Sequence, residues 1–135
     1  MFGNFEENAR KVLATAKKEM HDLKHPYVSS EHLLLSILKD KNEISEKLKN
    51  YNLDYKIFKD EVVNLLGIGK KESEWFLYTP LLKRIIENAI IDAKDNNGGT
   101  VTINHLFVSL LEEGEGVAIR ILLGMNIDVD ELYSD

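Results

Sequence analysis

The stretch VSSEHLLLSIL at residues 28–38 returns as VTINHLFVSLL at residues 101–111, an offset of 73 positions. Valine, histidine, leucine, serine and leucine recur in place, and each copy carries three consecutive apolar residues. Helices that are apolar nearly all round are usually buried, so the stretch predicts two central helices. Ser29 and Thr102 are residue types favoured at a helix N-cap. The pair of stretches therefore predicts an internal duplication of a helical unit.

The duplication extends to both sides of this stretch. Upstream, six apolar positions lie on one face at helical spacing in each copy. Downstream, after one extra residue in the second copy, NLD at 52–54 answers NID at 126–128. The matched upstream positions are Phe5, Ala9, Val12, Leu13, Ala16 and Met20 in the first copy, and Tyr78, Leu82, Ile85, Ile86, Ala89 and Ala93 in the second.

We expect an all-α fold of about eight helices, arranged as two four-helix repeats related by a pseudo-twofold axis. Residues 1–135 are expected to form one domain, since one repeat alone would bury little apolar surface. No region alternates with period two, so no sheet is expected. Repeat one is placed at about 5–66, the linker at 67–77 and repeat two at 78–133. Helices are expected over 6–23, 29–39, 42–50 and 54–66, then from Thr79-Pro80, from Thr102 and from about 128.

Composition excludes several classes of protein and site. The absence of cysteine excludes disulfide frameworks, Cys-ligated zinc and thiol nucleophiles. Net charge is −6, and residues 68–135 carry all of this excess, which disfavours nucleic-acid binding. No apolar run approaches the ~20 residues of a membrane span. No signal peptide is recognisable at the N-terminus, so a cytoplasmic protein without a membrane partner is expected.

The duplicated block resembles the Clp N-terminal repeat domain. The resemblance rests on EHLLL at 31–35 and EGEGVA at 113–118, and it covers about residues 1–133. The start, MFGNF at 1–5, and the opening YTP at 78–80 are similar to the ClpC branch in particular. The sequence departs from the family pattern at Glu6, Lys24, Asn104 and the segment 41–43, where threonine, glycine, glutamate and Gly-Glu-Gly are usual.

In that family the domain precedes two AAA+ ATPase modules. The resulting hexamer unfolds proteins and threads them into the ClpP peptidase, while the N-domain selects substrates and docks adaptor proteins. The resemblance thus implies a recognition domain without catalytic residues, metal or cofactor, because ATP is used by the other modules. The early end of the last helix suggests a longer protein. The alternative is a stand-alone adaptor or decoy with the same fold; a His-dependent hydrolase and a nucleic-acid binder are weaker rivals.

ClpC-type domains are implied by resemblance to bind phosphorylated arginine, a degradation mark. A guanidinium favours a carboxylate that accepts two parallel hydrogen bonds, and a phosphoryl group favours a helix N-terminus. Glu31 follows the Ser29 cap and could serve the first need, while Asn104 at the matching position lacks the charge. One strong site is therefore expected, or one strong and one weak. The alternative for Glu31 is a purely structural role beside the helix dipole. The candidate binding residues are Ser29, Ser30, Glu31, Thr102 and Asn104.

Three aromatic residues stand at the starts of the two repeats. Phe2, Phe5 and Tyr78 are candidates for an apolar groove that receives a hydrophobic peptide or an adaptor. The alternative is that these side chains only seal the core. Trp75, Phe76 and Leu77 at the linker end are expected to clamp the linker onto the body.

The histidines have structural interpretations. His32 and His105 occupy equivalent positions, and each is expected to hydrogen-bond a loop near its helix start. His21 and His25 are spaced like a helical metal pair, but Pro26 ends the helix there and the second copy has Lys94 and Gly98. No metal site is therefore predicted.

Overall fold

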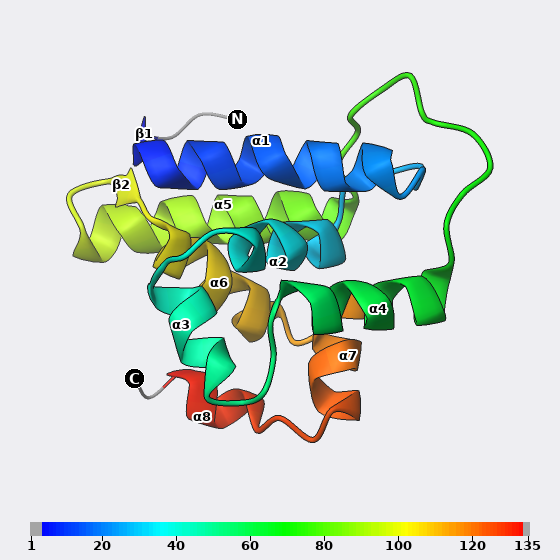
Figure 1. Ribbon diagram of the computed structural model, residues 1–135. Helices are drawn as coiled ribbons and strands as arrows, with labels where there is room; N and C mark the ends of the chain where they lie inside the picture. The colour runs from blue at the N-terminus through cyan, green and yellow to red at the C-terminus, as the bar shows by residue number, and fades with distance from the viewer. Residues whose placement is uncertain (1–3, 134–135) are drawn as a thin grey trace.

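The computed structural model describes residues 4–133, which contain eight α-helices and two very short strands (Figure 1). The predicted all-α fold is confirmed over this part of the chain. The helices are α1 (Glu7–Asp22), α2 (Ser30–Lys39), α3 (Glu43–Lys49), α4 (Tyr55–Leu66), α5 (Pro80–Asn96), α6 (Ile103–Glu113), α7 (Val117–Gly124) and α8 (Val129–Tyr133).

The two halves repeat the same arrangement of helices. Helix α1 packs against α2, and α5 packs against α6 in the same way. Helices α2 and α6 lie in the middle and touch each other, while α3, α4, α7 and α8 lie on the side away from α1 (Figure 1). Every residue from Leu33 to Leu35 is completely buried, as the apolar run predicts.

Local capping explains where several helices begin. The side chains of Asn42, Asp54, Thr79 and Thr102 each accept a backbone N–H from the first turn of the helix that follows. Pro80 fills the first position of α5, where no N–H is needed. The predicted starts at 42, 54, 79 and 102 are therefore confirmed.

The structure corrects the expectation that no strands form. Strand β1 (Asn4–Phe5) pairs in parallel with β2 (Thr100–Val101), and an isolated bridge joins Val28 to Tyr78. Phe5 and Tyr78 are equivalent under the 73-residue offset, and so are Val101 and Val28. The backbone N–H of Glu6 donates to Val101 at 2.9 Å, and that of Thr79 donates to Val28 at 3.0 Å. The lead-in segment of each half thus pairs with the other half.

Residues 67–79 cross from α4 to α5 and are held to the loop between α1 and α2. The Gly69 N–H donates to the Leu23 carbonyl at 2.9 Å, and a Cβ at Gly69 would lie 1.8 Å from the Lys24 oxygen. Only glycine fits this approach. The Trp75 indole donates to the Pro26 carbonyl, and the Phe76 ring meets the edge of His21. The predicted clamping of the linker is confirmed, although both aromatic side chains remain about half exposed.

Candidate functional site

The helix N-termini meet at two equivalent places between the halves. Junction one is the set Ser29, Ser30, Glu31, Thr79 and Gly116, where α2, α5 and α7 begin. The Ser29 and Thr79 hydroxyls lie 2.7 Å apart, and the Ala118 N–H donates to the Ser30 hydroxyl at 3.3 Å. Junction one is therefore built from both repeats, with several helix N-termini turned toward one region.

Glu31 is the only carboxylate of junction one, and it is 6 % exposed. Burial raises its pKa, while a backbone hydrogen bond, positive charge on His25 and the Ser30 hydroxyl act in the opposite direction. The Ser30 hydroxyl donates to Glu31 over a long 3.4 Å. An incoming cation would favour the ionised carboxylate and so would lower this pKa.

Gly116 brings the start of α7 close to the other two helices. Its φ is 99°, and a Cβ there would lie 2.4 Å from the Leu81 Cδ2 atom and 2.9 Å from the Ser30 Oγ atom. Both the backbone conformation and the close approach require glycine.

Junction two is the twofold counterpart and consists of Glu6, Asn42, Thr102, Ile103 and Asn104, where α1, α3 and α6 begin. Glu6 and Asn104 are both exposed. Glu6 precedes α1 without a side-chain capping bond, while Thr102 caps α6. Here Asn104 takes the place of Glu31, and Glu6 takes the place of Thr79.

Because the lead-in segment of each half pairs with the other half, two residues that depart from the family pattern come together at junction two. Glu6 belongs to repeat one and Asn104 to repeat two, yet both fall at junction two. Glu31 and Thr79, which keep the family pattern, both fall at junction one. Junction one therefore keeps the family residues at Glu31 and Thr79, whereas junction two departs from the family pattern at Glu6 and Asn104 and in the segment 41–43, which contains Asn42.

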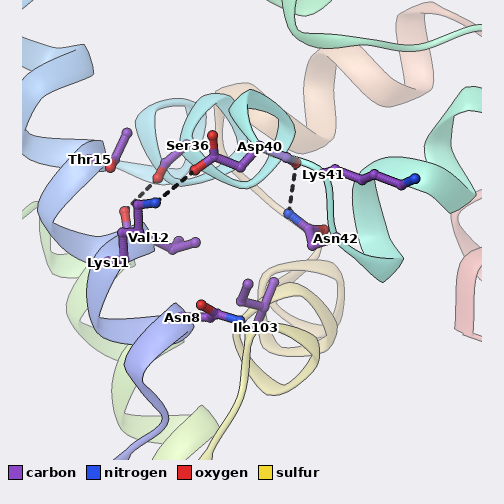
Figure 2. Close-up of a pocket in the computed structure, with 9 residues that line it drawn as sticks. All are labelled: Asn8, Lys11, Val12, Thr15, Ser36, Asp40, Lys41, Asn42 and Ile103. Atoms are coloured by element: carbon purple, nitrogen blue, oxygen red, sulfur yellow. Dashed lines mark hydrogen bonds and ion pairs between the residues drawn. The ribbon is translucent and has the colours of Figure 1, made fainter.

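Pockets flank junction two. Figure 2 shows one of about 140 Å³ between α1, the loop before α3 and the start of α6. In it the Lys11 ammonium lies 3.7 Å from the Asp40 carboxylate. At the equivalent place in the second half, Arg84 bridges Glu113 at 2.7 Å and Glu115 at 2.9 Å. The nine lining residues are Asn8, Lys11, Val12, Thr15, Ser36, Asp40, Lys41, Asn42 and Ile103.

The structure separates the residues expected to form an apolar groove. Phe5 lies before the first turn of α1, whereas Tyr78 lies near the other end of that helix, beside Lys17. Sixteen residues of helix span about 24 Å. Phe2 lies outside the described residues. Phe5 and Tyr78, each partly buried against the core, thus do not line one groove.

The histidines hold helix starts, as predicted. The Ser29 N–H donates to His32 Nδ1 at 3.0 Å, and the Thr102 N–H donates to His105 Nδ1 at 2.9 Å. Within residues 4–133, no group of three or more histidine and acidic residues is placed to hold a metal ion. In the same range no helix has the length and apolar character needed to cross a bilayer.

Sequence reasoning missed Thr79 and Gly116 as members of junction one. From the sequence, Thr79 is recognised only as the N-cap of α5. Gly116 lies three residues after the end of α6, in a loop with no pattern that marks a site. The signal that could have found them is the repeat itself, because a twofold arrangement brings the start of each half near the central helix of the other.

Known proteins match the chain in sequence. It is 35% identical over 132 residues to "Negative regulator of genetic competence ClpC/MecB" of Bacillus subtilis, and 33% identical over 132 residues to "Chaperone protein ClpB" of Oceanobacillus iheyensis. Each match covers 97% of the chain and 16% of the relative, so the chain spans about one sixth of their length.

Solved structures share the fold. The N-terminal domain of ClpD from Arabidopsis thaliana superposes with a TM-score of 0.79 at 19% identity, covering 96% of this chain and 92% of that one. The Hsp104 N-terminal domain from Candida albicans gives 0.76 at 17% identity, covering 94% and 85%. The sequence profile described as "Clp repeat (R) N-terminal domain" matches residues 4–125. This chain therefore belongs to the Clp repeat N-terminal domain family.

Proposed function

We propose that this chain is the substrate- and adaptor-recruiting domain of a ClpC-type protein unfoldase, and that junction one binds phosphorylated arginine. The observation that carries this proposal is the hydrogen bond between the Ser29 and Thr79 hydroxyls, which joins the start of α2, where the buried Glu31 lies, to the start of α5. The domain selects substrates by differences in binding affinity. ATP hydrolysis and peptide-bond cleavage belong to the ATPase and peptidase of the larger assembly, which acts in the cytoplasm. Several such domains on one hexamer would raise the effective concentration of a bound substrate.

The two ends of phosphoarginine match the two kinds of group at junction one. The Glu31 carboxylate can accept two parallel N–H bonds from a guanidinium. The starts of the ten-residue helix α2 and the seventeen-residue helix α5 carry the positive ends of the helix dipoles, which favour a phosphoryl group. The Ser29 and Thr79 hydroxyls share one hydrogen bond, so one of the two keeps its O–H as an additional donor. Burial strengthens each of these contacts, since less water screens them.

Junction two lacks the buried carboxylate and carries a negative charge where junction one has the Thr79 hydroxyl. The Asn104 amide carries no charge to pair with a guanidinium, and the Glu6 carboxylate would repel a phosphoryl group. We therefore expect one phosphoarginine per domain.

Calorimetric titration with free phosphoarginine tests the proposal. We expect one equivalent bound by the unaltered domain and a loss of affinity of about tenfold to a hundredfold in Glu31→Ala, since hydrogen bonds to charged groups are worth about 1.5–3 kcal/mol. Asn104→Ala is the matched control at junction two and should bind like the unaltered domain. Arginine and inorganic phosphate, titrated separately, show whether both ends of the ligand are needed.

Rebuilding junction two is the sharper experiment. The double variant Glu6→Thr, Asn104→Glu restores the family residues at these two positions of junction two, and we expect the stoichiometry to rise from one to two. Two equivalents in the unaltered domain would contradict the asymmetry between the junctions. No binding by a folded domain would overturn phosphoarginine recognition and leave peptide capture or adaptor docking as the means of recruitment.

A further inference from the structure

Two histidines connect the start of α2 to the linker through three hydrogen bonds in series. The Ser29 N–H donates to His32 Nδ1 at 3.0 Å. His32 Nε2 lies 2.8 Å from His25 Nδ1, and His25 Nε2 lies 2.8 Å from the Gly67 carbonyl oxygen. Both rings are buried, with His32 only 1 % exposed. The series therefore joins α2, the loop after α1 and the beginning of the linker inside the protein.

The two ends of the series fix every proton in it. The Gly67 carbonyl only accepts, so His25 Nε2 must carry a proton. The Ser29 amide only donates, so His32 Nδ1 must be bare. In neutral rings this leaves His32 Nε2–H to donate to the bare His25 Nδ1. All three bonds are satisfied only when both histidines are neutral Nε2–H tautomers.

One added proton breaks this order wherever it binds. A proton on His25 Nδ1 would face the His32 Nε2–H. If His32 changed tautomer to accept it, the new Nδ1–H would face the Ser29 N–H. Either arrangement sets two donors against each other in a buried site, which is costly.

The charged groups around the pair act in both directions. Glu31 on α2 interacts with His25. Burial raises the pKa of the Glu31 carboxyl, and positive charge on His25 has a smaller effect that lowers it. On the loop side, His21 Nδ1 of α1 lies 3.2 Å from the Glu72 carboxylate of the linker. Lys24 is exposed next to His25. Burial, and then positive charge on His25, lower the pKa of His32 to about 3.

The sign of the pH effect follows from His32. Its folded pKa lies below the value of about 6.5 for a free histidine, so the folded state binds fewer protons than the unfolded chain between about pH 6.5 and pH 3. The stability that the neutral ring contributes is full above this window and is lost as the pH falls through it.

We propose that His25 and His32 form an acid-sensitive latch, which when neutral holds the linker and the α1–α2 loop against the start of α2 and which opens on gaining one proton. The latch is specific to the first half. In the second half His105 caps its helix in the same way, but its Nε2 faces the Asn96 side-chain oxygen at 3.1 Å and no second ring follows.

The single tryptophan reports on the latch directly. Trp75 donates its indole N–H to the carbonyl of Pro26, the residue after His25. We expect its emission maximum to shift to the red between pH 7.5 and pH 5, with the far-UV circular dichroism unchanged. Over the same range, the hydrogen-exchange protection of the Ser29 and Gly69 amides should fall by about tenfold after correction for intrinsic rates. Side-chain NMR at pH 7.5 should show His25 and His32 as neutral Nε2–H tautomers.

Three variants separate the latch from general acid sensitivity. In His25→Gln the amide can donate to Gly67 and accept from His32 without titrating, so Trp75 should keep its emission at pH 5. His25→Ala should show the shifted emission at both pH values. His105→Gln is the matched control, and its Trp75 transition should equal that of the unaltered domain.

Several results would overturn the latch. These are an unchanged Trp75 emission and unchanged protection at pH 5, the same transition in His25→Gln, or an Nδ1–H tautomer of either ring at pH 7.5. Loss of the whole helical signal at pH 5 would show global unfolding and would equally contradict a local opening. Because none of these readouts involves phosphoarginine, they test the latch independently of the proposed function.

Discussion

Two buried serines stabilise the helix pairs from within. The Ser36 hydroxyl donates to the Val12 carbonyl at 2.6 Å, and the Ser109 hydroxyl donates to the Ile85 carbonyl at 2.6 Å. The four residues are equivalent under the 73-residue offset, and both serines are almost completely buried. Each bond ties a central helix to its outer partner, α2 to α1 and α6 to α5.

Replacing either serine should therefore have the same effect. We expect Ser36→Ala and Ser109→Ala each to lower the free energy of unfolding by about 1 kcal/mol, the typical net value of an intramolecular hydrogen bond. Urea denaturation measures the change. Lys18→Ala, on the exposed side of α1, is the control and should stay within about 0.5 kcal/mol. A cost found for only one of the serines would show that the two halves differ in their core.

At the scale of elements, one carboxylate connects three helices. Glu19 of α1 is 1 % exposed, and Lys39 of α2 donates to it at 3.1 Å. The Tyr55 hydroxyl of α4 donates to its other oxygen, and burial followed by this hydrogen bond raises the pKa of Tyr55. The equivalent residue in the second half is Asp92, which is partly exposed. The outer helix α4 is thus attached to α1 by a hydrogen bond from the Tyr55 hydroxyl to a buried carboxylate.

Removing this charge should loosen the contact of α4 with the body. We expect Glu19→Gln to lower the free energy of unfolding by about 2 kcal/mol, because the buried acceptor loses the charge that strengthens its hydrogen bonds with Tyr55 and Lys39. Asp92→Asn is the matched control, with an expected change below about 0.5 kcal/mol. Chemical denaturation followed by circular dichroism compares the two. Equal effects would contradict a special role for Glu19.

The elements differ in how far the sequence predicts them. Helix starts at Asn42, Asp54, Thr79 and Thr102 are predictable because a cap is a local interaction between neighbouring residues. The pairing of β1 with β2 is not, since two residues give no periodicity and the partner lies 96 positions away. Glu31 and Asn104 are found as candidates because the repeat aligns them in sequence. The contact of Thr79 with Ser29 joins residues 50 positions apart and appears only in the folded structure.

For the whole molecule, the shared core and the crossed lead-in segments make the halves interdependent. Helices α2 and α6 touch at the centre, and each half lacks one strand or bridge partner without the other. A lone half would also expose the apolar residues that it now buries.

Unfolding should accordingly be a single transition. We expect the calorimetric and van't Hoff enthalpies to agree, with a value of about 95 kcal/mol near 60 °C from the average of about 0.7 kcal/mol per residue. Scanning calorimetry of the intact domain measures this. Residues 1–72 and 73–135, produced separately, should give circular dichroism spectra of unfolded chains. A folded half, or two resolved transitions, would contradict this interdependence.

The crossed lead-in segments also bear on the history of the chain. Two copies that exchange equivalent segments about a twofold axis have the geometry of an isologous homodimer whose subunits became joined through residues 67–79. In such an ancestor every substitution would alter both junctions at once. Fusion into one polypeptide removes that constraint, and each junction can then change alone. Glu6 and Asn104, gathered at one junction while Thr79 and Glu31 stay at the other, are the kind of divergence that only the fused chain permits.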